Sequence, residues 1–125
     1  MDIKEWVDGL RRLSPEQIVQ AHIGLQEQIK KHYKLRAVGS NLKKATHLCE
    51  QMVALAELAY PALEEMHYKR VSEHESVLGQ KHPDPEYYRP THHGYRQLIT
   101  IMKKRKDMGR VEGLEAKRDA EGWRS

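Results

Sequence analysis

Residues 81–95, KHPDPEYYRPTHHGY, gather three histidines, three tyrosines and three prolines within fifteen positions. Imidazole and phenol groups can transfer protons, and aromatic rings beside basic side chains can stack on single-stranded nucleic acid. The stretch contains no serine or cysteine nucleophile and no glycine-rich phosphate loop, and its prolines exclude a helix or a central strand. We interpret residues 79–91 as a stiff joint. A joint that also contacts a partner and a catalytic site are the alternatives.

Metal chemistry is the second candidate, because the chain has eight histidines. Glu64 and His67 form an E-x-x-H pair, the ligand pair of helical di-iron bundles, and His74 lies two turns beyond His67. Such a site needs two pairs and two further carboxylates, whereas the chain offers one pair. A symmetric dimer would have to supply the second. We therefore predict no metal and no cofactor, and a helical di-metal enzyme is an alternative function.

Single reactive side chains give weaker signals. His47 and Cys49 are two residues apart, so on a helix they point about 200° from one another and cannot act together as base and nucleophile. Cys49 lies in an apolar segment and is predicted to be a core thiol. His22 falls on an apolar stripe and is predicted to be a buried histidine with one hydrogen-bond partner.

Basic residues are the most informative feature, because they are unevenly spread. Residues 30–44 carry +6 with no acid, and residues 96–110 carry +5, although the whole chain carries only +4. The remaining segments therefore sum to −7. Lys43 and Lys44 fall in the predicted first turn of a helix, where the helix dipole disfavours positive charge. Their presence there favours a function in anion binding.

We predict that a bend at Gly39 and Ser40 gathers six cations at the tip of a helical hairpin, with a second contact in a later helix. The predicted site consists of Lys30, Lys31, Lys34, Arg36, Lys43 and Lys44, with Lys103, Lys104, Arg105 and Lys106 as the second contact. Pairing of these cations with the acidic face of a second subunit is the alternative. That face comprises Glu57, Glu64, Glu65, Glu73 and Glu75.

The elements that position these residues are all predicted to be helices, in a small all-α bundle. Ser14, Pro15 and Gln17 form a capping box with proline at the first helical position, so a helix starts at Pro15. Thr91 and Ser40 are predicted caps, and Pro61 should kink the central helix. The expected helices span residues 2–12, 15–38, 41–78 and 92–108. We expect one domain over residues 1–108 and a weakly structured tail over 109–125.

The central helix carries a heptad-like apolar seam from Leu48 to Met66, through which we expect a homodimer. It should extend beyond the preceding helix, leaving an overhang for the first helix, the last helix or a second subunit to cover. The composition, with 125 residues, 38% apolar residues and a mean hydropathy of −0.84, suits a thin-cored soluble protein. A single cysteine and the lack of a signal-peptide pattern or membrane-spanning segment lead us to expect a cytoplasmic protein.

We predict a non-catalytic binding protein whose partner is polyanionic: nucleic acid, or an acidic surface on a protein of nucleic-acid machinery. The long helices do not match a helix-turn-helix, and Gly39 and Ser40 interrupt any continuous basic zipper helix. Contact should therefore depend on the phosphate backbone. The alternative is a protein adaptor or inhibitor, of phage or mobile-element origin, that uses apolar helix faces together with Tyr87, Tyr88 and Trp123.

Overall fold

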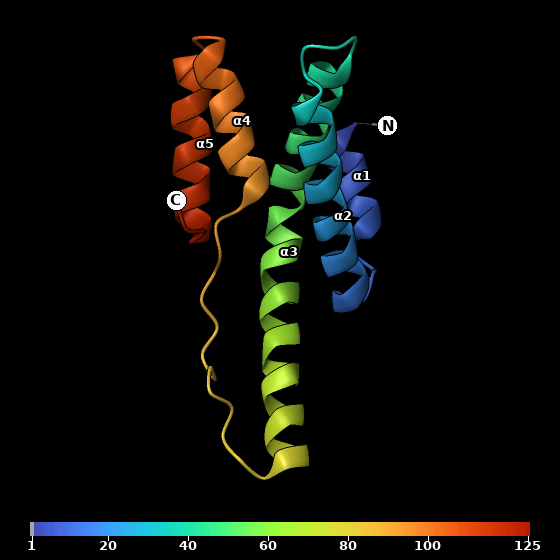
Figure 1. Ribbon diagram of the computed structural model, residues 1–125, viewed down its shortest axis with the longest axis vertical. Coiled ribbons are helices and arrows are strands. Elements are labelled where there is room, and N and C mark those ends of the chain that lie inside the picture. Colours follow the sequence, from blue (N-terminus) through green and yellow to red (C-terminus); the bar gives the residue numbers. More distant parts are fainter. Residues whose placement is uncertain (1) are drawn as a thin grey trace.

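The computed structural model describes residues 2–125, which form an all-α bundle and no strand; one isolated parallel bridge joins Thr91 to Arg124. Two long helices form an antiparallel hairpin, and three shorter helices pack against it (Figure 1). The helices are α1 (Ile3–Leu10), α2 (Pro15–Lys34), α3 (Asn41–Leu78), α4 (His93–Lys104) and α5 (Met108–Glu121). The predicted fold class is confirmed.

The start of α2 follows the predicted local chemistry. Ser14 accepts a hydrogen bond from the backbone N–H of Gln17, and the Gln17 side chain accepts one from the Ser14 N–H. The end differs from the prediction, because α2 stops at Lys34. Beyond it the chain changes to i→i−3 hydrogen bonds, and Gly39 takes the left-handed φ of 53° that the bend requires.

The prediction that Ser40 caps α3 through its side chain is wrong. Ser40 makes no side-chain capping bond; its backbone is not extended as a capping residue requires, with φ −94° and ψ 15°. Instead the Asn41 side-chain amide donates to the carbonyl of Val38 at 2.8 Å. The Asn41 Oδ1 lies 2.8 Å from His32 Nδ1, which ties the first residue of α3 to the last turn of α2.

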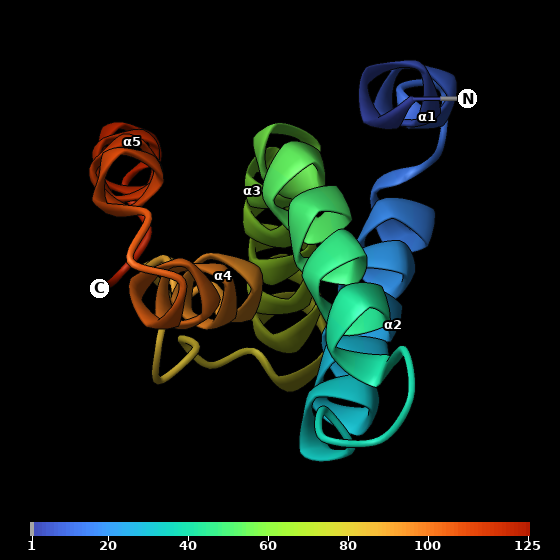
Figure 2. The same cartoon turned by 90° about the horizontal axis from the view of Figure 1, so that it is seen from above.

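The core lies where α3 meets its neighbours. Viewed from above, α3 stands between α2 and α1 on one side and α4 and α5 on the other (Figure 2). The seam residues Met52, Leu55, Ala59 and Ala62 are buried, and α2 supplies most of the contacts to α3. Since this seam is covered within the chain, the predicted homodimer through α3 has only the far end of that helix available to it.

That far end arises from a difference in length, because α3 has 38 residues and α2 has 20. α3 runs through Pro61 without a break and changes direction near its middle (Figure 1). Neither α1 nor α4 covers the overhang. The extended segment 79–91 returns alongside it instead (Figure 1), so this joint serves as a strap over one side of α3.

The C-terminal part of the chain contradicts two predictions. The cap of α4 is His92, whose side chain accepts from the Tyr95 N–H, and not Thr91. Residues 109–125 are not a weakly structured tail, since most of them belong to α5, with Val111 and Trp123 buried. Gly109 and Gly113 lower the local helix propensity, but packing of the apolar face against α4 and α3 outweighs it.

Candidate nucleic-acid interface

The bend between α2 and α3 brings the six predicted hairpin cations to one end of the molecule. All six side chains are exposed. Lys30, Lys31 and Lys34 come from the last turns of α2, Arg36 from the bend, and Lys43 and Lys44 from the first turns of α3. The predicted bend and the gathering of these residues are therefore confirmed.

The second basic segment, Lys103–Lys106, lies at the same end of the molecule, which the sequence did not predict. The Lys104 Nζ of α4 donates a hydrogen bond of 3.1 Å to the Tyr33 hydroxyl of α2. Arg36 lies over the same ring, 4.5 Å from its centroid. Tyr33 thus joins the end of α4 to the hairpin tip, and we call the ten cations from both segments the basic end.

The basic end has almost no internal counter-charge. Within residues 2–125, Lys30 is the only one of the ten cations in an ion pair, at 3.8 Å from Glu27, and both side chains are exposed. The rest of the chain then holds twelve basic residues against eighteen acidic ones. Like charges that lack partners repel one another, so this arrangement is suited to a polyanion.

Two hollows lie within the basic end. One, of about 380 Å³, is bordered by Tyr33, Arg36, Lys104 and Arg105, and thus by both basic segments. The other, of about 550 Å³, lies between the end of α2 and the start of α3. The residues around the second hollow are Gln28, His32, Ser40, Lys43, Lys44, His47 and Leu48.

Histidine and tyrosine side chains of the strap hold it against α3. The His82 ring lies 4.8 Å from that of His74, and the Tyr87 ring lies 5.5 Å from that of His67. Arg89 stacks on the ring of Tyr60. These contacts connect the strap to α3 and agree with the interpretation of residues 79–91 as a joint.

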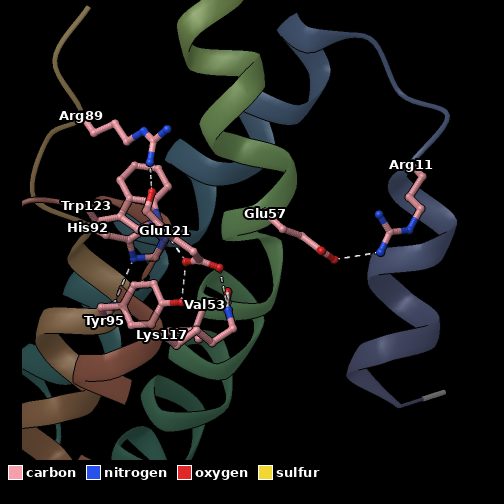
Figure 3. Close-up of polar contacts among 9 residues, drawn as sticks. All are labelled: Arg11, Val53, Glu57, Arg89, His92, Tyr95, Lys117, Glu121 and Trp123. Atoms are coloured by element: carbon pink, nitrogen blue, oxygen red, sulfur yellow. Dashed lines mark hydrogen bonds and ion pairs between the residues drawn. The ribbon is translucent and has the colours of Figure 1, made fainter. Parts of the chain in front are cut away.

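A polar cluster that the sequence did not reveal fastens α5 to α4 (Figure 3). Glu121 accepts hydrogen bonds from the Tyr95 hydroxyl at 2.6 Å and from Trp123 Nε1 at 3.1 Å. Lys117 donates to Glu121 at 2.9 Å and to the Tyr95 hydroxyl at 2.8 Å, and Arg89 donates to the Glu121 carbonyl. We call these five residues the docking cluster. The i,i+4 spacing of Lys117 and Glu121 was the one local signal for it.

The docking cluster is not poised for proton transfer. Tyr95 is fully buried, and burial, followed by its hydrogen bond to Glu121, raises the pKa of the phenol far above its usual range. The hydroxyl therefore stays protonated. Trp123 is only 4% exposed, so it is not available as the contact residue that the alternative adaptor function requires.

Two buried histidines pack beside Trp123. The His92 ring lies 4.8 Å from the ring of Trp123 and 5.3 Å from that of His22. Burial lowers the pKa of His22 to about 4 and that of His92 to about 3. His22 is buried as predicted, and within residues 2–125 its Nδ1 has no hydrogen-bond partner.

The remaining candidate residues do not come together as a reactive site. Cys49 is fully buried, and burial raises the pKa of its thiol to about 12, so the prediction of a core thiol is confirmed. Within residues 2–125, no three His, Cys, Asp or Glu side chains are grouped so that they could hold a metal ion. Glu64, His67 and His74 therefore lack the arrangement of a di-metal centre.

No helix within residues 2–125 combines the length and the apolar character that crossing a bilayer requires. Comparison of the chain with protein-family models, curated protein sequences and solved structures gives no match.

Proposed function

We propose that this chain is a non-catalytic binding protein that contacts the phosphate backbone of nucleic acid through its basic end. The observation that supports this most is the contact of Lys104 with Tyr33. It places cations from α2, α3 and α4 at one end of the molecule, where they are exposed and almost free of acidic partners.

The chemistry of the basic end favours backbone contact over reading of bases. Lysine and arginine neutralise phosphates and release condensed counterions, which supplies affinity without sequence selectivity. Base reading requires an element that enters a groove, and the basic end consists of helix ends and a bend rather than one exposed recognition helix. We therefore expect strong salt dependence and weak sequence preference.

The experiment measures the affinity for fluorescent DNA and RNA oligonucleotides over a series of salt concentrations. Combined Lys43→Glu and Lys44→Glu substitutions should weaken binding and reduce the slope of log K against log salt by about two, since each phosphate contact contributes about 0.9 on duplex DNA. The matched control is Arg70→Glu with Lys81→Glu. Both side chains are exposed and neither forms an ion pair within residues 2–125, and Arg70 lies about 40 Å from Lys43 along α3.

A second variant tests whether the two basic segments act together. Arg105→Glu with Lys106→Glu should reduce the salt slope by a similar amount, because both residues lie at the end of α4 beside the hairpin tip. An affinity that is unchanged by both pairs of substitutions, or reduced equally by the control pair, contradicts the proposal.

The adaptor function is the second candidate, and exposed apolar residues at the far end of α3 and on the strap favour it. Val77, Leu78 and Tyr88 are 79%, 57% and 73% exposed, and this region also offers the remaining surface for the proposed homodimer. A pull-down from nuclease-treated and untreated extracts separates the two functions. Capture that survives nuclease and is lost with Val77→Gln and Leu78→Gln supports the adaptor.

A further inference from the structure

A third basic hollow lies on the side of the molecule formed by α4, α5 and the residues after α5. It measures about 320 Å³ and shares only Lys103 with the basic end. Arg96 and Lys103 of α4, Arg118 of α5 and Arg124 border it, together with Thr91 and Thr100. We call it the α4–α5 hollow. Arg96, Arg118 and Arg124 were not among the site residues predicted from the sequence.

The charge around this hollow is only partly compensated: Ser125 also borders it, but within residues 2–125 the main-chain carboxylate of Ser125 forms no ion pair with the four cations. Of its four basic side chains, only Arg118 forms an ion pair within residues 2–125, through its Nε to the Asp119 carboxylate at 3.0 Å. That side chain is 16% exposed, so its charge is partly removed from water. Four cations around one depression repel one another, and a bound anion would relieve this repulsion.

The basic side chains project from fixed backbone. Arg96 and Lys103 are seven residues apart on α4, so they lie on the same side of the helix two turns apart. Arg124 follows α5, and its backbone N–H donates to the Pro90 carbonyl at 3.2 Å within the parallel bridge to Thr91. Two helices and a segment held by a backbone hydrogen bond therefore place cations around one hollow.

We propose that the α4–α5 hollow binds a phosphate group. Three arginines offer planar pairs of N–H donors that match the oxygen atoms of phosphate. Lys103 adds a point charge on the side that faces the basic end. The phosphate could belong to a free phosphorylated compound or to a nucleic-acid strand that continues past Lys103, and the chemistry of recognition is the same for both. The site does not depend on nucleic-acid binding at the basic end.

The test is a titration of the isotopically labelled full chain with inorganic phosphate, followed by NMR at constant ionic strength with chloride as the reference anion. We expect saturable shifts of the backbone and side-chain N–H signals of Arg96, Arg118 and Arg124. Arg96→Gln and Arg124→Gln should each weaken phosphate binding about tenfold or more, because a hydrogen bond to a charged group is worth at least one decade of affinity. Both residues are exposed, so the fold should persist.

Arg70→Gln, which removes one exposed charge from the α3 overhang, is the matched control and should leave phosphate binding unchanged. Shifts no larger than those caused by chloride, or the same dissociation constant in both glutamine variants as in the wild type, would overturn the proposal.

Two further ligands identify the source of the phosphate. If it is a backbone phosphodiester, a single-stranded oligonucleotide shifts the same arginine signals and competes with inorganic phosphate. If it is a free phosphorylated compound, a nucleoside monophosphate competes and the oligonucleotide leaves the arginine signals in place. An oligonucleotide that fails to shift Lys43 and Lys44 contradicts the function proposed for the basic end but not the phosphate site.

Discussion

Two lysine–tyrosine hydrogen bonds of similar length lie in different surroundings in this molecule. Lys117 donates to the Tyr95 hydroxyl at 2.8 Å and Lys104 to the Tyr33 hydroxyl at 3.1 Å. Tyr95 is fully buried, and Lys117 also pairs with Glu121. Tyr33 is only partly buried, and within residues 2–125 Lys104 has no carboxylate partner.

The difference separates cations that hold the fold together from cations that are free to bind. In the docking cluster, Lys117 has a carboxylate, a hydroxyl and a backbone carbonyl as acceptors, so its charge is largely used within the protein. At the basic end, nine of the ten cations have no carboxylate partner within residues 2–125, although Arg36 and Lys104 donate to Tyr33. Charge pairing, more than charge density, therefore indicates where a ligand would bind.

The largest effect should come from removing the anchor of the docking cluster. Trp123→Ala should lower the free energy of unfolding by about 3–5 kcal/mol, as expected for a buried tryptophan. The folded fraction should still bind nucleic acid, because the basic end is untouched. Urea unfolding followed by circular dichroism measures the loss. Tyr88→Ala, at an exposed position, is the control, with an expected change within about 0.5 kcal/mol. A similarly small loss for Trp123→Ala would mean that α5 is not docked as described.

Much of the framework is predictable from local sequence, because local chemistry determines it. The Ser14–Gln17 capping box and the left-handed Gly39 depend only on neighbouring residues. Helix α5 could not be predicted in this way, since its glycines disfavour a helix and its stability comes from contacts of residues such as Trp123 with α4 and the strap.

The cations of the basic end were also predictable from the sequence only in part. The six hairpin cations follow from a bend at Gly39 that sequence predicts. The addition of Lys103–Lys106 depends on the direction in which α4 returns after the strap, and tertiary packing of its buried face, including Leu98 and Ile101, determines that direction. The arginines of the α4–α5 hollow come from separate helices and a terminal segment, so no spacing in the sequence connects them.

The next effect concerns pH and the interior beside the docking cluster. His22 and His92 have folded-state pKa values of about 4 and about 3, below the ordinary value of 6.5. Between pH 6.5 and the folded-state pKa of each histidine, the unfolded chain binds more protons than the folded chain. The contribution of these histidines to the free energy of unfolding is therefore fully present above about pH 6.5 and falls as the pH drops. The slope should reach about 1.4 kcal/mol per pH unit for each histidine, or roughly 3 kcal/mol for His22 by pH 4.

Urea unfolding of the wild type and of His22→Gln over this range measures the contribution of His22. The variant should show a shallower fall in stability with acid, because one of the two buried imidazoles no longer titrates. Equal slopes in both proteins would show that the side chain of His22 is hydrated in the folded state, contrary to its burial.

The smallest effect has opposite signs for folding and for binding. Lys43 lies in the first turn of α3, where the helix dipole disfavours a cation and Ser40 provides no cap. Lys43→Glu should therefore raise the free energy of unfolding by about 0.3–1 kcal/mol while weakening the binding of nucleic acid. Lys117→Gln is the counterpart from the docking cluster and should destabilise the fold without changing that affinity. Thermal melts and oligonucleotide titrations of both variants test the contrast. If Lys43→Glu destabilises the protein as Lys117→Gln does, Lys43 has a structural partner. The distinction between free and paired cations then does not hold for the basic end.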